Sequence, residues 1–218
     1  MAKKEKERRY RKRRGGIAHT ILAVLLIAAS VVAACTVFFR VEEVTVEGNE
    51  RYSQEQILSV ASVEMGANMI LTPGEQIAQR IYRALPYVDH VEVQKRFPTT
   101  LKMVITESQP VAVITGAAST WIVDAKGKLL EQADETQAQE YTKVTGLELL
   151  EPEQGAQAQT TPENQAQLDG LTAMTTALAS CGLMEGMTSI DVSSKTEIVM
   201  VYDGRLTVKV LNNVDFDR

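Results

Sequence analysis

Residues that build catalytic and metal centres are scarce in this chain of 218 residues, which has two cysteines and two histidines. Two cysteines exclude a disulfide-stapled scaffold and a four-cysteine zinc site. The sequence contains no Ser-x-x-Lys, Gly-x-Ser-x-Gly, Walker A, His-Glu-x-x-His or Cys-x-x-Cys motif. His90 stands alone, and the adjacent Glu42 and Glu43 point to opposite faces of an expected strand. We therefore predict a protein that is not an enzyme, with no cofactor, no metal site and no small-molecule substrate.

Charge is distributed unevenly along the chain. Residues 1–14 contain nine basic and two acidic side chains, whereas the other 204 residues contain 14 basic and 26 acidic ones. A basic tail of net charge +7 thus precedes an acidic body of net charge −12. Basic arms also occur in nucleic-acid-binding proteins, but this one lies directly before an apolar segment. Its position favours a membrane topology signal, with no nucleic-acid partner.

One long apolar run follows the basic tail. Residues 17–39 contain only four polar side chains, those of His19, Thr20, Ser30 and Thr36. A helix of this length extends about 34 Å, which is enough to cross a hydrocarbon core of about 30 Å. The basic tail comes first, so the positive-inside rule places it in the cytoplasm and residues 40–218 outside the cell membrane. We predict a single-pass protein with a cytoplasmic tail over 1–16 and a transmembrane helix over 17–39.

Two other interpretations of the apolar segment remain open. A cleaved signal peptide normally has an apolar region of about 7–15 residues, shorter than this one. Val32-Ala33-Ala34-Cys35 resembles a lipobox, but the apolar run continues through residues 36–39, where a lipoprotein normally has a polar tether. An uncleaved span is therefore favoured. Cys35 would then lie in the bilayer and Cys181 outside it, so no disulfide is expected between them, and Cys181 is expected in the core.

The segment after the span shows the pattern of a small α+β domain. Three stretches alternate apolar and polar residues as strands do, and these are 44–47, 91–97 and 101–106. Gly48 and Asn49 follow the first stretch, and Pro98 separates the other two, so each marks a turn. The expected core comprises Val44, Val46, Ile77, Ile81, Leu85, Val91, Val93, Met103 and Ile105.

Two helices are expected between the first and second of these strands. Ser53 and Gln56 form a capping box that begins the first helix. Thr72 is expected to cap the second helix with Pro73 at its first position, and Pro86 ends it. The resulting order is β-α-α-β-β, with two helices on one face of a three-stranded sheet.

Short motifs in this order and spacing resemble a POTRA domain, and most closely that of the FtsQ/DivIB cell-division proteins. Members of that family also carry a basic tail and a single span directly upstream. The motif residues are Gly48, Asn49, Gly66, Asn68, Pro86, Pro98 and Pro110. Most of them suit turns or the ends of strands, so we expect them to maintain the fold and not to contact a ligand. The resemblance assigns residues 40–110 to the POTRA domain.

Residues 111–218 are expected to form a second, mixed and β-rich domain. Strands over 111–114 and 121–123 precede a turn from Asp124 to Gly127, and Trp121 is expected in the core. Residues near 151–162 are polar and rich in glutamine, which predicts a mobile loop. Thr161-Pro162 is expected to begin a helix that ends at Gly182.

The clearest hairpin in the sequence is formed by 198–202 and 206–211, joined by Asp203-Gly204 as a two-residue type I′ turn. The FtsQ/DivIB family normally continues beyond it with a helix and a strand, so the domain is expected to be C-terminally truncated. A strand left at an edge can bind an extended partner. The candidate partner-binding edge is Leu206, Thr207, Val208, Lys209, Val210 and Leu211.

The resemblance implies a non-enzymatic, membrane-anchored scaffold of the bacterial division machinery at the septum. It would bridge FtsB/DivIC-like and FtsL-like single-span partners and help to control septal wall synthesis. The alternative is a membrane-anchored POTRA-type envelope chaperone or secretion component. An outer-membrane assembly protein would need a β-barrel of about 200 residues or more. About 100 residues follow the POTRA segment here, which is too few for such a barrel, so this form of the alternative is not expected.

Overall fold

The computed structural model describes residues 2–116 and 119–212. The chain divides into two compact units. The first unit comprises Met1–Thr45, Val63–Pro73 and Gln94–Met103. The second unit comprises Val46–Ser62, Gly74–Val93 and Val104–Arg218. These units differ from the two predicted domains, because each unit contains part of residues 40–110.

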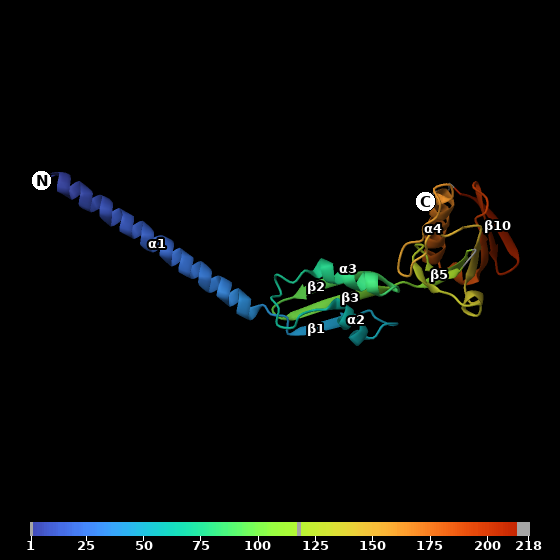
Figure 1. Cartoon of the computed structure of the whole chain (residues 1–218), viewed down its shortest axis with the longest axis horizontal. Helices are drawn as coiled ribbons and strands as arrows, with labels where there is room; N and C mark the ends of the chain where they lie inside the picture. Colours follow the sequence, from blue (N-terminus) through green and yellow to red (C-terminus); the bar gives the residue numbers. More distant parts are fainter. Residues whose placement is uncertain (1, 117–118, 213–218) are drawn as a thin grey trace. The chain divides into compact units, whose positions relative to one another are not determined.

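Helix α1 (Ala2–Phe38) is continuous and contains the expected apolar segment (Figure 1). Within it, His19–Phe38 is long and apolar enough to cross a membrane, and none of this segment is buried in the protein. Ser30 Oγ donates a hydrogen bond to Leu26 O (2.9 Å), and Thr36 Oγ1 donates one to Ala33 O (2.8 Å). These two hydroxyls are satisfied within the helix, so they cost little in an apolar surrounding.

The predicted β-α-α-β-β order is present after α1. Its elements are β1 (Glu43–Glu47), α2 (Gln54–Ala61), α3 (Gly74–Ala84), β2 (Val88–Arg96) and β3 (Thr100–Glu107). The three strands form one sheet in the order β1-β3-β2 (Figure 1). The last strand in the chain therefore lies between the first two, and β1 and β2 are the edges of this sheet.

The two helices of this domain begin differently from one another. Ser53 Oγ accepts a hydrogen bond from Gln56 N (3.3 Å), and Gln56 Oε1 accepts one from Ser53 N (2.9 Å), as the capping box predicted. Helix α3 begins at Gly74, so Pro73 precedes the helix and does not occupy its first turn. A Cβ at Gly74 would lie 3.3 Å from Val93 Cβ, so the start of α3 packs closely on β2.

The core of this domain is larger than the apolar periodicity predicted. Six expected core residues are buried, namely Ile77, Ile81, Leu85, Val91, Met103 and Ile105, and three are half-buried, namely Val44, Val46 and Val93. Six further side chains are fully buried, namely Val41, Ile57, Ala61, Met69, Val88 and Leu101. Val41 and Met69 lie outside helices and strands, so no periodic pattern marks them.

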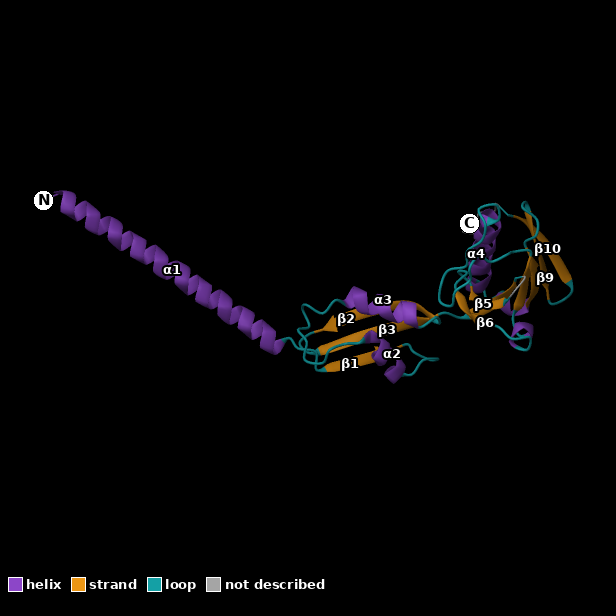
Figure 2. Cartoon of the chain, in the orientation of Figure 1, coloured by secondary structure: helices purple, strands orange, loops and turns teal. Residues whose placement is uncertain are grey.

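The second sheet has seven strands in the order β10-β9-β8-β7-β4-β5-β6. Figure 2 labels β5, β6, β9 and β10 of this sheet beside α4. These strands are β4 (Pro110–Thr115), β5 (Thr120–Asp124), β6 (Leu129–Gln132), β7 (Thr142–Thr145), β8 (Met187–Asp191), β9 (Glu197–Tyr202) and β10 (Leu206–Leu211). Strand β7 pairs in parallel with β4 and β8, whereas the other pairings are antiparallel. Two short 3₁₀ helices, Gln137–Gln139 and Met184–Gly186, lie in its connections.

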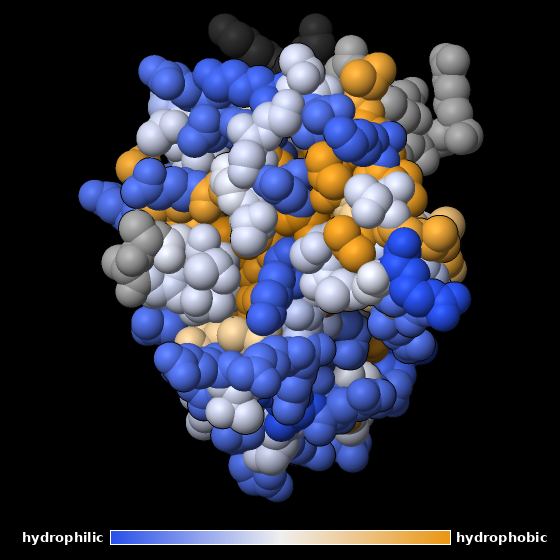
Figure 3. Space-filling model, turned by 90° about the vertical axis from the view of Figure 1, so that its right-hand side faces the viewer, coloured by the Kyte–Doolittle hydropathy of each residue, from blue (hydrophilic) through white to orange (hydrophobic). Residues whose placement is uncertain are grey.

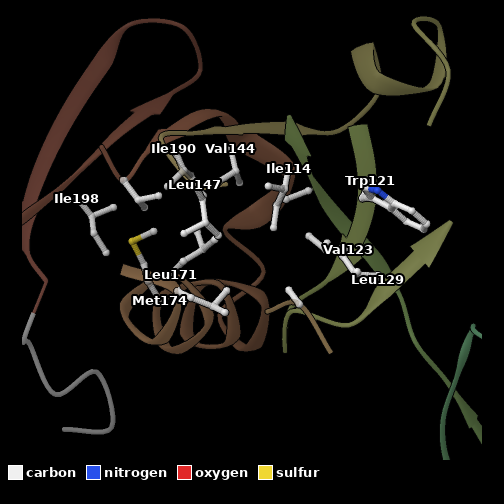
Figure 4. Close-up of a cluster of buried hydrophobic side chains, with 14 of the residues drawn as sticks. Ile114, Trp121, Val123, Leu129, Val144, Leu147, Leu171, Met174, Ile190 and Ile198 are labelled. Carbon is white, nitrogen blue, oxygen red and sulfur yellow. The ribbon is translucent and has the colours of Figure 1, made fainter. Parts of the chain in front are cut away.

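Helix α4 (Gln165–Ser180) packs against this sheet and forms the main core of the second domain. Leu171 and Met174 of α4 meet Ile114, Val144 and Ile190 of the central strands (Figure 4). The sheet therefore buries one side under a single helix. Trp121 is buried in the same cluster as predicted, and its Nε1 donates a hydrogen bond to Ser119 Oγ (2.9 Å).

Helix α4 begins later than the sequence predicted. Residues 161–164 form a turn closed by Asn164 N donating to Thr161 O (2.9 Å), so Thr161-Pro162 precedes the helix. The end at Gly182 is as predicted, because this glycine has a φ of +69°. Cys181 lies at the helix end and is exposed, so its prediction as a core residue was wrong.

The segment near 151–162 lies beside β6 and has no regular secondary structure. Leu129 N donates to Ala156 O (2.9 Å), Gly155 N donates to Leu129 O (2.7 Å), and Ala158 N donates to Gly127 O (2.8 Å). Nothing in the composition of this segment indicated these bonds. They restrain its middle, and its mobility stays a prediction.

Candidate functional site

Strand β10 is one of the two edges of the seven-stranded sheet in the described part of the chain, and β6 is the other. It pairs with β9 along its whole length, from Leu206↔Tyr202 to Leu211↔Glu197. Beyond the strand, Asn212 N donates a hydrogen bond to Thr196 O (2.9 Å) and continues this ladder. The side of β10 that faces away from β9 has no strand partner among residues 2–116 and 119–212.

The direction of the backbone groups along β10 follows from the bond at Asn212. Successive residues of an antiparallel strand direct their N–H and C=O groups alternately to the two sides. Because Asn212 directs its N–H to the β9 side, Val210, Val208 and Leu206 do so as well. The three residues between them direct theirs away from β9, and these are Thr207, Lys209 and Leu211.

The side chains of β10 leave apolar surface exposed on both faces of the strand. Leu206 is 62%, Val208 43% and Leu211 60% exposed, whereas Val210 is half-buried and packs against the main core. Lys209 Nζ lies 3.7 Å from Glu197 Oε1 of β9, an exposed ion pair. Figure 3 shows apolar side chains reaching the molecular surface between polar ones. An edge with apolar side chains and unpaired backbone groups is a template for an added strand.

The hairpin tip differs by one residue from the prediction. Asp203 and Gly204 have φ values of 52° and 63°, and Arg205 N donates to Tyr202 O (3.0 Å), as expected for a type I′ turn. The pairing starts at Leu206↔Tyr202, however, so three residues connect the strands instead of two. The tip is held by tertiary bonds, because Gly204 N donates to Thr188 Oγ1 (3.1 Å) and Asp203 N donates to Gly186 O (2.8 Å).

The motif residues of the first domain lie at backbone turns. Gly48 has a φ of +79°, and a Cβ there would lie 2.2 Å from Ile105 O. Asn49 Nδ2 donates to Tyr52 O (2.8 Å), and Asn68 Oδ1 accepts from Ile70 N (2.9 Å). Each side chain thus closes a local turn. Gly66 has a φ of +81° in open space, so only its backbone conformation requires glycine.

The remaining motif residues lie at the ends of elements. Pro86 follows α3, Pro98 follows β2, and Pro110 begins β4 opposite Asp124. Asp124 Oδ1 accepts hydrogen bonds from Lys126 N (2.9 Å) and Lys128 N (2.8 Å), and its Oδ2 accepts one from Ser108 Oγ (3.0 Å). These bonds fix the turn that Asp124 and Gly127 were expected to form.

Lys128 is a buried cation that no sequence pattern marks. It is 1% exposed, its Nζ donates to Val88 O (2.6 Å), and the same Nζ lies 3.8 Å from the centroid of the Tyr82 ring. Burial lowers the pKa of Lys128, and the carboxylates of Asp124 and Asp89 oppose that effect. The side chain connects the start of β6 with β2 and α3, so we assign it a structural role.

A second polar cluster centres on Tyr87. Its Oη donates to Glu131 Oε1 (2.5 Å), its ring centroid lies 3.7 Å from Arg51 Cζ, and its N donates to Tyr52 Oη (3.2 Å). Burial and the bond to Glu131 raise the pKa of Tyr87, so the phenol stays a donor at neutral pH. Among the described residues, no group of three or more His, Cys, Asp or Glu side chains is placed to bind a metal.

Comparison with known proteins gives the class of this fold. Residues 39–108 match the family model described as "POTRA domain, FtsQ-type". The chain is similar to the cell division protein FtsQ of Geotalea daltonii, with 32% identity over 120 residues that cover 53% of this chain and 42% of that protein. It is also similar to the cell division protein DivIB of Clostridium acetobutylicum, with 24% identity over 112 residues that cover 51% and 45%.

A solved structure, that of the major extracytoplasmic domain of the cell division protein DivIB from Geobacillus stearothermophilus, matches with a TM-score of 0.32 and 15% identity. The match covers 49% of this chain and 81% of that one. This chain spans less than half of the length of the two curated relatives described above.

The molecule is thus a protein in which an FtsQ-type POTRA domain follows an N-terminal apolar helix and precedes a β-rich domain. Residues 39–108 match the FtsQ-type POTRA family model, and the chain is similar to the cell division proteins FtsQ and DivIB, the family that its motifs resemble. The similarity to these proteins and the apolar helix together indicate a membrane-anchored protein with an extracytoplasmic domain. The two curated relatives are both cell division proteins.

Proposed function

We propose that this chain is a non-enzymatic scaffold of the division machinery that bridges FtsB/DivIC-like and FtsL-like single-span proteins at the septum. By holding these partners together it helps to control septal wall synthesis. Its N-terminus lies in the cytoplasm and residues 40–218 lie outside the membrane. The observation that supports a docking role most directly is the edge strand β10, which leaves backbone groups and apolar side chains uncovered in the described part of the chain.

The proposed docking mode is the addition of an extended segment of the FtsB/DivIC-like partner to β10. The outward N–H and C=O groups of Thr207, Lys209 and Leu211 would pair with that segment. Its alternating side chains would meet Leu206 and Val208 on one face of the sheet and Leu211 on the other. Backbone pairing supplies the affinity in this mode, and the exposed apolar side chains fix the register.

Replacing Lys209 by proline tests this mode directly. Lys209→Pro removes a backbone donor that points away from β9, so it leaves the β9–β10 hydrogen bonds in place. We expect the affinity of the full chain for the purified FtsB/DivIC-like partner to fall about tenfold, which corresponds to about 1.4 kcal/mol. Binding is measured by titration in detergent.

Two further variants control this experiment. Lys209→Ala removes the side chain and its ion pair with Glu197 but keeps the backbone donor, so affinity should stay within about twofold, because exposed ion pairs contribute little. Val208→Pro removes a donor that points to β9 and should unfold the hairpin, as a loss of thermal stability shows. If Lys209→Pro binds as tightly as Lys209→Ala, β10 is not the docking edge.

Co-purification from membranes tests the assignment of this chain to the division machinery. The full chain should co-purify with FtsB/DivIC-like and FtsL-like proteins and localise at the septum. Co-purification with secretion components in place of division proteins would contradict the proposal and favour an envelope chaperone.

A further inference from the structure

Large apolar side chains are exposed on the first unit where α1 ends. We call these residues the juxtamembrane surface, and they are Phe38 (69% exposed), Met65 (61%), Ile70 (47%), Leu71 (79%) and Phe97 (57%). Phe38 is the last residue of α1, the next three lie between α2 and α3, and Phe97 follows β2. Single exposed apolar residues are common on soluble proteins, but a group of this kind marks a binding surface.

Backbone hydrogen bonds attach the segment that contains Met65, Ile70 and Leu71 to the residues directly after α1. Met69 N donates to Phe39 O (2.8 Å), Val41 N donates to Ala67 O (2.9 Å), and Gly66 N donates to Val41 O (2.7 Å). The segment therefore follows the end of α1 closely and cannot move far from it without breaking these bonds.

The turn after β2 is attached to the same place. The rings of Phe39 and Phe97 pack edge to face, with 5.4 Å between their centroids. Glu42 N donates to Thr99 O (2.9 Å), and Lys95 Nζ donates to Ile70 O (3.0 Å). Two loops that are distant in sequence are thus attached to the residues that directly follow the apolar helix.

This attachment determines where the loops lie relative to a bilayer. The candidate span ends at Phe38, so that residue marks the outer boundary of the hydrocarbon core. The headgroup region beyond this boundary is about 5–7 Å thick. Phe39 and the loops bonded to it follow within a few bonds, so they lie in this layer, where aromatic and apolar side chains are favoured.

The charged residues beside the juxtamembrane surface do not by themselves account for binding to a membrane. Arg40 and Arg96 are exposed beside it, but so are Glu42, Glu43 and Glu64 of the same unit. The basic side chains suit lipid phosphates, and the acidic ones offset their attraction to an anionic membrane. The apolar side chains therefore carry the interaction, and anionic lipid is not required for it.

We propose that the juxtamembrane surface is a lipid-binding surface, which inserts its apolar side chains into the outer interface of the same bilayer that α1 crosses. The occupant is the lipid, and neither a partner protein nor a second copy is needed to cover these side chains. This proposal depends on the proposed function in one respect, because it requires that α1 crosses the membrane.

Site-specific fluorescence in vesicles tests the proposal with the full chain. The two cysteines are replaced by Cys35→Ala and Cys181→Ser, and a single cysteine is introduced by Leu71→Cys and labelled with an environment-sensitive fluorophore. The protein is reconstituted at low density in phosphatidylcholine vesicles with and without lipid that carries a nitroxide quencher near the headgroup. We expect the label at position 71 to lose about half of its fluorescence to this lipid.

Two matched positions make the result decisive. Leu183→Cys places the label at another exposed leucine, in the second domain, where we expect no quenching by lipid. Val24→Cys places it within the candidate span, where quenching is expected if α1 crosses the bilayer. Phe97→Cys repeats the measurement from the second loop, in case the label at position 71 disturbs its own segment.

The outcomes separate this proposal from the membrane anchor itself. If position 24 is quenched but positions 71 and 97 are not, and both stay open to aqueous iodide, the anchor stands and the lipid surface is refuted. If positions 71 and 97 are shielded from iodide without quenching by lipid, protein covers the surface, and the proposal is again refuted. If position 24 is not quenched, the single span and this proposal both fail.

Discussion

Gly48 and Gly66 have nearly the same backbone conformation in different surroundings. Their φ values are +79° and +81°, but a Cβ at Gly48 would meet Ile105 O at 2.2 Å, whereas a Cβ at Gly66 would meet nothing within 4 Å. Both glycines were expected to maintain the fold. The sequence pattern does not distinguish them, because the space available to a Cβ depends on a strand that is distant in sequence.

Alanine at these two positions is expected to have unequal effects on stability. Gly66→Ala should lower the free energy of unfolding by about 1 kcal/mol, the cost of a left-handed conformation for a residue with a Cβ. Gly48→Ala adds a clash with a backbone carbonyl, so the loss should exceed about 3 kcal/mol. Chemical unfolding of the full chain in detergent measures both, and equal losses would contradict the close approach of β3 to Gly48.

Helices α2, α3 and α4 show how far local signals define an element. The capping box of α2 is local, so its first turn could be predicted from Ser53 and Gln56. The predicted starts of α3 and α4 were wrong by one and by several residues. Thr72 Oγ1 donates to Asn68 O (2.9 Å), and residues 161–164 form a separate turn, so local bonds compete with the expected caps.

The buried face of α3 carries a prediction at the scale of this element. Ile81 is 0% exposed, so Ile81→Ala should lower the free energy of unfolding by about 2–5 kcal/mol through lost burial and a cavity. Gln79→Ala lies on the exposed face of the same helix and should change it by less than about 0.5 kcal/mol. Thermal unfolding followed by circular dichroism compares the two. An unchanged midpoint for Ile81→Ala would show that α3 is not packed on its isoleucine face.

At the scale of the whole molecule, the basic tail and the apolar helix define the expected topology. Residues 1–14 carry a net charge of +7, and His19–Phe38 can cross a membrane. The positive-inside rule then orients the chain with both folded domains outside. The proposed orientation would place the β10 edge and the juxtamembrane surface on the outer side of the membrane, where the septal wall is made.

Reporter fusions check this orientation. A reporter that is active only outside the membrane should be active when fused after Arg218 and inactive when fused at Lys12. The reverse pattern would contradict the positive-inside assignment. Release of the domains by signal peptidase, or a diacylglyceryl group on Cys35, would show that α1 is not an uncleaved span.

The sequence by itself determined the apolar helix, the β-α-α-β-β order, the hairpin of β9 and β10 and the resemblance to FtsQ-type POTRA proteins. These features depend on local hydrophobic periodicity, turn residues and charge, which are properties of short segments. The sequence also predicted both buried residues of α3, Ile77 and Ile81, because their spacing matches the helical repeat.

Only the tertiary structure decided which residues meet across the chain. Strand order placed β10 at an edge, and the end of α4 exposed Cys181 instead of burying it. Lys128 is buried because Val88 O and the Tyr82 ring provide its partners, and these lie about 40 residues earlier in the sequence. The juxtamembrane surface likewise forms from two loops that meet at Phe39. Such contacts depend on the packing of distant segments, which no local pattern encodes.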